Sequence, residues 1–164
     1  MRHEVSSSNR SQDSAAPNTV NVVRVRPIES HAAVRLVEKL TIFIGAATDE
    51  RTLRGFGRRV GVSRGAFRNW CRTAGLTPRS VRDFARGLRA AWRLEREPSF
   101  CPSDVLDIID ERALRAFCLN CGGANSECPR TVEDFLKRQS FITNREFVRQ
   151  VRAFLQSITF TPLS

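Results

Sequence analysis

The chain has 164 residues, with 27 Lys and Arg against 17 Asp and Glu, so its formal net charge is +10. All of the basic residues except Lys39 and Lys137 are arginine. A basic excess of this size favours a polyanionic partner, and nucleic acid before a membrane surface. No apolar run approaches the ~18 residues of a membrane span, and the first residues lack the apolar segment of a secretory signal. We therefore expect a cytoplasmic protein, and in that compartment its five cysteines should be reduced rather than paired.

The N-terminal part differs in composition from the rest of the chain. Residues 1–29 are rich in Ser, Asn and small residues, which predicts a disordered arm. Residues 20–26, VNVVRVR, favour extended backbone but have no evident partner strand. The arm either solubilises the protein or brings its arginines to a minor groove. Beyond it, we divide the chain into a first helical unit at 30–97 and a second at 98–160.

The stretch 53–72, LRGFGRRVGVSRGAFRNWCR, has the spacing of a helix-turn-helix. After a helix from Ser30 to about Ala47, a second helix starts at Asp49 or Thr52. Gly57 allows a close helix crossing, Gly61 allows a left-handed turn, and Ser63 is a good N-cap for a helix that ends before Gly75. The positions expected to face inward are Phe56, Val60, Val62, Phe67 and Trp70. The positions left outside on the later helix are Arg64, Gly65, Arg68, Asn69 and Arg72.

A long helix is predicted next, over about 77–97, with Thr77 as N-cap and Pro78 at its first position. One stripe of it is apolar, and consists of Val81, Phe84, Ala85, Leu88, Ala91 and Trp92. A second stripe is cationic, and consists of Arg79, Arg82, Arg86, Arg89, Arg93 and Arg96. We expect this second stripe to face outward and some of its members to bind phosphates. The alternative is an ordinary solvated face, although such faces usually mix charges of both signs.

A short helix is expected at 103–110, and there the chain repeats itself. Residues 109–122, IDERALRAFCLNCG, match 48–61, TDERTLRGFGRRVG, at a constant offset of 61. After Gly122 the second copy differs, because Pro129 would interrupt its second helix and no arginine-rich face follows. We predict a helix of separate register at 131–139 and a last helix from Asn144 to about Ser157. The apolar stripe of that last helix packs in the protein's own core or forms a dimer interface; it consists of Phe147, Val148, Val151, Phe154, Leu155 and Ile158.

The cysteines suggest an alternative to nucleic-acid binding, namely a structural zinc site. Cys118, Cys121 and Cys128 have C-x2-C-x6-C spacing, and Cys101 could complete a zinc site. Against this, the first two occupy repeat positions that should face the core, so we predict no metal. His3 and His31 are isolated, and no nucleophile, paired carboxylate or phosphate-binding loop is present in a plausible setting. We expect neither an enzyme nor a cofactor.

The order of these segments resembles the DNA-binding domain of AraC/XylS-type bacterial transcription regulators. The resemblance covers roughly residues 31–96 and continues weakly to about 122. It is carried by Leu53, Gly57 (alanine in most members), Val60-Gly61, Ser63, Phe67, Trp70 (usually Phe) and Gly75-Leu76-Thr77-Pro78, with Arg86 or Arg89 near the usual linker-helix arginine. Family members contact the major groove with the middle of the recognition helix, which here includes Gly65, a residue without a side chain. The family usually has two such units and often an effector-binding domain, for which this chain has no room.

The sequence thus predicts an all-α bundle with a helix-turn-helix, a long linker helix and a second, degenerate helix-turn-helix-like unit. The predicted function is that of a sequence-specific transcription regulator bound to double-stranded DNA at the bacterial nucleoid. Base contacts are assigned to Arg64, Arg68 and Asn69. Phosphate contacts are assigned to Arg58, Ser63, Arg72, Thr77 and Arg79. A homodimer through the C-terminal helices would enlarge the stretch of DNA that the protein contacts. The alternatives are a helical protein-interaction module with a relic helix-turn-helix and a nonspecific nucleic-acid binder.

Overall fold

The computed structural model describes residues 31–159, and the predicted N-terminal arm and the Ser30 cap lie outside them. This part of the chain is all-helical, as predicted, apart from a single β-bridge between Ala124 and Glu127. Its helices are α1 (His31–Ile44), α2 (Leu53–Arg59), α3 (Arg64–Thr73), α4 (Pro78–Arg96), α5 (Pro102–Leu106), α6 (Glu111–Asn120), α7 (Val132–Arg138) and α8 (Arg145–Thr159). No helix within 31–159 is long and apolar enough to cross a membrane.

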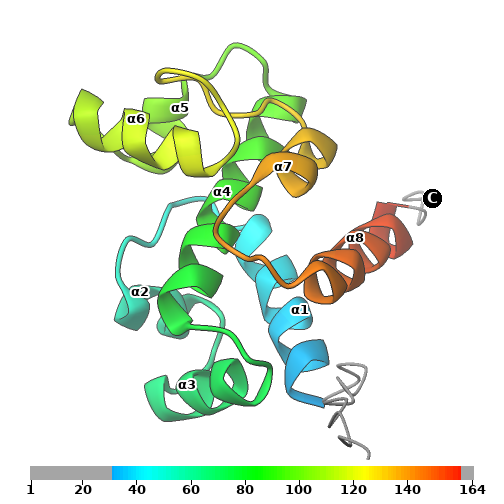
Figure 1. Ribbon diagram of the computed structural model, residues 1–164. Coiled ribbons are helices and arrows are strands. Elements are labelled where there is room, and N and C mark those ends of the chain that lie inside the picture. Colours follow the sequence, from blue (N-terminus) through cyan, green and yellow to red (C-terminus); the bar gives the residue numbers. More distant parts are fainter. Residues whose placement is uncertain (1–30, 160–164) are drawn as a thin grey trace, which may run out of the picture.

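The long helix α4 lies at the centre of the molecule (Figure 1). It contacts α1, α2 and α3 near one end and α5 and α7 near the other. All eight residues from 84 to 91 are buried, so α4 has no outward stripe in its middle. A Cβ on Gly87 would lie 2.9 Å from Cζ of Phe135 and 3.1 Å from Sγ of Cys121. Only glycine therefore lets α7 pack this closely against α4.

The first unit is formed by α1, α2 and α3 around one end of α4. Three residues cap its helices with their side-chain oxygens: Thr52 accepts from Gly55 N at 3.0 Å, Ser63 from Ala66 N at 3.2 Å, and Thr77 from Ser80 N at 3.2 Å. These hydroxyls satisfy backbone donors that helix starts leave free. The predicted starts of α3 and α4 are confirmed, and Thr52 rather than Asp49 starts α2.

A chain of aromatic rings joins the three helices. Phe56 lies 4.9 Å from Phe43 of α1 and 5.2 Å from Phe67 of α3, measured between ring centroids, and all three side chains are buried. Aromatic pairs at such distances stabilise a core beyond their buried area, by about 0.5–1.5 kcal/mol each. The predicted inward face of 53–72 is thus confirmed, with Trp70 only partly buried.

The turn between α2 and α3 depends on two glycines. Gly61 has φ +68°, a left-handed conformation that glycine adopts at little cost. Val62 N donates to Gly57 O at 2.8 Å, and a Cβ on Gly57 would lie 2.9 Å from Val62 O. The close approach predicted at Gly57 is therefore to the turn that follows α2.

The sequence repeat corresponds to a repeated structure. Gly122 has φ +87° and takes the place of Gly61. Gly123 N donates to Cys118 O at 2.9 Å, as Val62 N does to Gly57 O. The ends of α2 and α6 therefore share one hydrogen-bonded turn, at the offset that the sequence shows.

After this turn the two units differ. Ser63 caps α3 two residues after Gly61, whereas Thr131 caps α7 nine residues after Gly122. The intervening segment turns back on itself, and buried Pro129 precedes the helix rather than interrupting it. The predicted helix of separate register at 131–139 is confirmed as α7.

Two predicted helices have different extents in the structure. The helix expected at 103–110 ends at Leu106, because Asp107 has φ +50° and cannot continue a right-handed helix. The helix expected to reach about Ala47 ends at Ile44.

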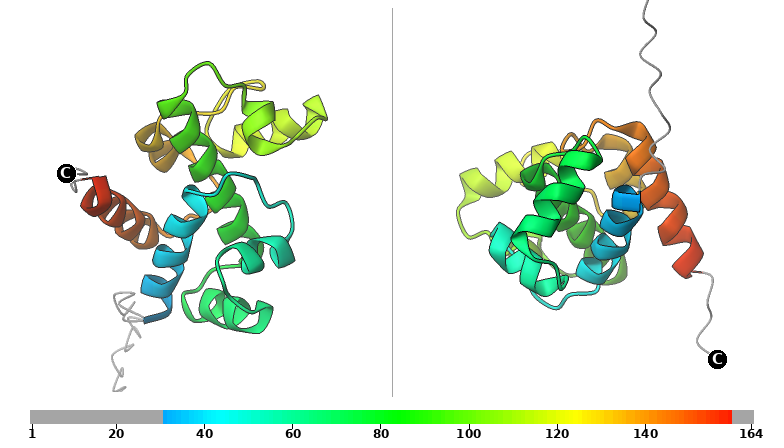
Figure 2. Two further views of the ribbon diagram at one scale, coloured as in Figure 1. Left: turned by 180° about the vertical axis from the view of Figure 1, so that it is seen from behind. Right: turned by 90° about the horizontal axis from the view of Figure 1, so that it is seen from below.

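The last helix, α8, packs beside α1 on the side away from α3, which both views of Figure 2 show. Its buried residues are Phe147, Val148, Val151 and Leu155. The core of the protein itself thus takes up most of the apolar stripe predicted for a dimer interface. Phe154 is partly buried and Ile158 is exposed.

Candidate nucleic-acid interface

The helix α3 lies at one extremity of the molecule, at the opposite end of α4 from α6 (Figure 1). Phe67 and Cys71 hold its inner face in the core. Its outer face is exposed to solvent and carries Arg64, Gly65, Arg68, Asn69 and Arg72, the residues predicted from the sequence. Among residues 31–159, no other helix covers this outer face of α3.

The charge around α3 has a single sign. From Arg51 to Arg82 the sequence contains no Asp or Glu, and it contains nine arginines: Arg51, Arg54, Arg58, Arg59, Arg64, Arg68, Arg72, Arg79 and Arg82. Within residues 31–159, no ion pair involves Arg54, Arg58, Arg64 or Arg68, and all four are exposed. Their charge is therefore available to an anionic partner.

The base-contact candidate Asn69 is hydrogen-bonded to a neighbour on the same face of α3. Arg72 Nη2 donates to Asn69 Oδ1 at 2.8 Å. This bond holds the Asn69 amide, whose nitrogen and second oxygen lone pair remain available for an adenine edge. Arg72, predicted as a phosphate contact, thus also positions its neighbour.

The predicted phosphate contacts differ in what they can still donate. Ser63 Oγ accepts the cap bond from Ala66 N, which leaves its hydroxyl hydrogen free. Thr77 donates its hydroxyl hydrogen to Ser80 Oγ at 2.8 Å, so the fold already uses the donor that a phosphate would need. Arg79 is 83% exposed and lies 3.8 Å from Asp83, a pair worth little in water.

The predicted outward arginine stripe of α4 is wrong for Arg86 and Arg89, which are buried. Arg86 Nε donates to Asp49 Oδ2 at 2.7 Å. Arg89 donates to Ala46 O at 2.8 Å, Ala47 O at 2.7 Å and Val105 O at 2.8 Å. Burial is the main cause that lowers the pKa of Arg89. Both side chains join the loop after α1 to α5, and hence the first unit to the second.

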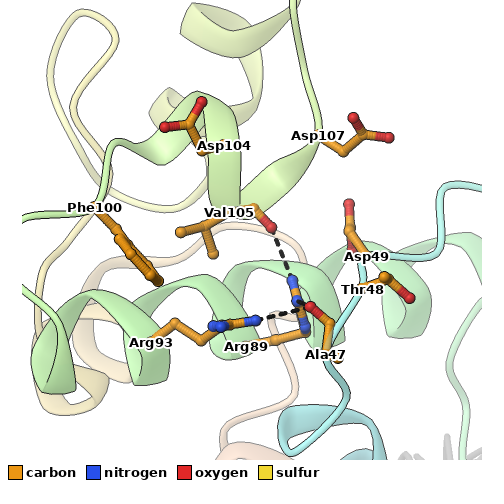
Figure 3. A pocket seen from close by; sticks show the side chains of 9 residues that line it. All are labelled: Ala47, Thr48, Asp49, Arg89, Arg93, Phe100, Asp104, Val105 and Asp107. Carbon is orange, nitrogen blue, oxygen red and sulfur yellow. Dashed lines mark hydrogen bonds between the residues drawn. The ribbon is translucent and has the colours of Figure 1, made fainter.

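Most of the other arginines in that stripe also contact groups of the protein itself. Arg93 Nη1 donates to Ala47 O at 2.8 Å, and its guanidinium lies 5.6 Å from the ring centroid of Phe100 (Figure 3). Arg82 pairs with Asp83, and Arg96 lies over the Trp92 ring. Of the stripe, Arg79 alone extends the charge around α3 at the start of α4.

A pocket of about 530 Å³ lies at this joint. Figure 3 shows Arg89 and Arg93 extended along its floor toward the backbone of Ala47, with Asp104 and Asp107 on the opposite wall. Asp49 Oδ1 is buried there without a hydrogen-bond partner among the described residues. The pocket thus borders the contacts that join the two units, and it lies apart from α3.

In the second unit, acidic and basic residues are nearly equal in number over 111–138, unlike in the stretch 51–82 of the first unit. The charged residues of 111–138 are Glu111, Arg112, Arg115, Glu127, Arg130, Glu133, Asp134, Lys137 and Arg138. Arg115, Lys137 and Arg138 pair with acidic residues one helical turn earlier. The repeated unit therefore keeps the turn of the first but presents no comparable cationic face.

The cysteines form a disulfide, which overturns the expectation that all five are reduced. Cys118 and Cys128 are bonded, because the turn at 123–127 brings their Cα atoms to 4.7 Å. Of the other two candidate ligands, Cys121 is buried, which raises its pKa to about 12, and Cys101 is exposed. Within residues 31–159, no group of three His, Cys, Asp or Glu side chains could hold a metal.

Comparison of the chain with protein-family models, curated proteins and solved structures gives no match. The assignment of function therefore depends on the geometry and charge described above. Arg54 is a further cationic candidate that was not predicted from the sequence; it lies one turn before Arg58 on α2 and is exposed like it. The spacing of four residues between Arg54 and Arg58 is the signal that could have found it.

Proposed function

We propose that this protein is a sequence-specific DNA-binding transcription regulator that places α3 in the major groove of double-stranded DNA. The observation that carries the proposal is the exposed face of α3, where no ion pair within residues 31–159 involves Arg64 or Arg68 and where the sequence from 51 to 82 contains no Asp or Glu. A solvated surface without function usually carries both signs. The segment order that resembles AraC/XylS-type regulators supports the same function and would place the protein in the bacterial cytoplasm, at the nucleoid.

In this proposal, two arginines and an asparagine of α3 select the bases. Arg68 and Asn69 are adjacent at the middle of the exposed face, where side chains reach base edges, and Arg64 lies one turn earlier. Arginine pairs with two acceptors of guanine, and asparagine pairs with adenine. Arg54, Arg58 and Arg79 surround this face, from α2 and from the start of α4, and neutralise phosphates.

One helix-turn-helix contacts only a short stretch of DNA, so we also propose that two copies of the protein bind together. The groove between α1 and α8 is lined by Val34, Val37, Gln150, Ala153 and Phe154, and it offers an apolar surface for a second copy. Sedimentation of the protein with and without DNA tests this, since a monomer in both states would contradict it.

The test of DNA binding is a selection from a random duplex library with the full chain, followed by affinity measurements on the enriched duplex. We expect an enriched motif, and we expect Arg68→Ala to weaken binding by about 1–3 kcal/mol and to relax preference at one base pair. Arg112→Ala is the matched control, because Arg112 is exposed on α6 and no ion pair involves it within residues 31–159. It should leave affinity unchanged.

Two other outcomes would replace the proposal. A nonspecific binder would show steep salt dependence, with a slope of about −0.9 per phosphate contacted, but no enriched motif. A protein-interaction module would bind no duplex at moderate salt.

A further inference from the structure

Gly65 lies in the first turn of α3. Its Cα is exposed, and a Cβ built on it would have no heavy atom within 4 Å. Its backbone is helical and lies outside the left-handed region. Gly61 and Gly75, in contrast, have φ values of +68° and +70°, and Gly87 has a crowded neighbourhood. The fold therefore needs glycine at these other positions but not at 65.

Glycine at this position has a cost. A helix that contains glycine is less stable than one that contains alanine, because glycine has more backbone freedom to lose on folding. Within residues 31–159 no turn or contact requires glycine at position 65, so the fold itself does not account for it.

The neighbours of Gly65 indicate what approaches. On a helix surface, residues three and four positions apart are adjacent. Gly65 is thus adjacent to Arg68 and Asn69, and it follows Arg64 in sequence. All three side chains are exposed. The missing side chain leaves a gap within the charged face, bordered by the residues assigned to the bases.

We infer that Gly65 is a positioning residue that sets how deeply α3 enters the major groove. Without a Cβ, the α3 backbone lies directly against the edges of the base pairs. This depth brings the ends of Arg68 and Asn69 to their hydrogen-bonding positions. A side chain at 65 holds the helix away from the DNA. The inference rests on the proposed function, because it requires duplex DNA at α3.

The experiment uses the full chain, its Gly65→Ala and Gly65→Leu variants, and the duplex that the unmodified protein enriches from a random library. Gly65→Ala should raise the Tm by about 1–4 °C, because alanine favours the helix and meets no neighbour. Its affinity for the duplex should fall about tenfold, the order of one lost base contact, and Gly65→Leu should lower it further.

A matched control is Gly45→Ala at the end of α1. A Cβ there would make only an ordinary contact, 3.9 Å from Ile42 O, and the residue borders a pocket with Trp92 and Arg96, away from α3. This variant should bind the duplex like the unmodified protein. Selection repeated with Gly65→Ala should show weakened base preference, a change that an effect on stability alone would not cause.

The outcomes separate the two proposals. If the unmodified protein enriches a motif and Gly65→Ala binds it equally well, the inference about Gly65 is wrong and the proposed function stands. If the unmodified protein enriches no motif, both are overturned.

Discussion

The buried Arg89 gives the sharpest test of how the two units are joined. We consider its replacement by methionine, whose unbranched apolar side chain can follow the stem of Arg89 but lacks the guanidinium. The change removes three hydrogen bonds of 2.7–2.8 Å, to Ala46 O, Ala47 O and Val105 O. It leaves Val105 O without this partner in a fully buried position, while the other two bonds are only partly buried.

The expected magnitude follows from opposing contributions. A net hydrogen bond to a charged group contributes about 1.5–3 kcal/mol, and a buried acceptor without a partner costs about 1–3 kcal/mol. Removal of the buried guanidinium recovers its desolvation penalty, which is also the main cause of the lowered pKa of Arg89. We therefore expect Arg89→Met to lower the free energy of unfolding by about 2–4 kcal/mol.

Urea unfolding monitored by circular dichroism measures this change. The control is Arg93→Met, one helical turn later, which loses an exposed bond to Ala47 O and the contact of its guanidinium with the Phe100 ring, and should cost only about 1 kcal/mol. If Arg89 instead faced a phosphate, Arg89→Met would leave the unfolding midpoint unchanged and reduce the salt slope of DNA binding by about one. That result would refute the role of Arg89 in the joint.

Two further predictions concern the cysteines. Burial raises the pKa of Cys71 and of Cys121 to about 12 from 9.0, so the unfolded thiols ionise first and the free energy of unfolding should stay constant below about pH 8. It should fall above pH 9 by up to about 1.4 kcal/mol per pH unit for each thiol, and the chain has no tyrosine whose ionisation would add to this slope. Urea midpoints from pH 7 to 10.5 test this, and a variant with alanine at both positions should remove most of the slope. The disulfide between Cys118 and Cys128 spans ten residues, so a reductant should lower the free energy of unfolding by about 3 kcal/mol. A variant with alanine at both of these positions should not respond to the reductant, and an equal response would contradict the assignment.

The local features of the fold could be predicted because they depend on residues close in sequence. Ser63 and Thr77 cap their helices through donors three residues later, and Gly61 forms its turn with bonds that span only a few residues. The exposed face of α3 follows from the same local periodicity once Phe67 is placed inside. For this reason the sequence also located the candidate base contacts.

Contacts between distant segments could not be predicted in this way. Cys118 and Cys128 pair because of a turn that the C-x2-C spacing gave no reason to expect. The loop that lies over Arg89 comes from residues more than 40 positions earlier. Helical periodicity predicts which residues share a face of a helix, but it does not predict how many faces of that helix are covered by other helices.

For this protein, the sequence alone determined the helices, their caps, the repeated turn and the charge of the α3 face, since these follow from residue type and short-range spacing. The tertiary structure alone decided the role of the α4 arginines. Because α4 is surrounded by helices of both units, Arg86 and Arg89 find backbone carbonyls and Asp49 where a solvent-facing stripe was expected. The cationic surface is thereby confined mainly to α2, α3 and the start of α4.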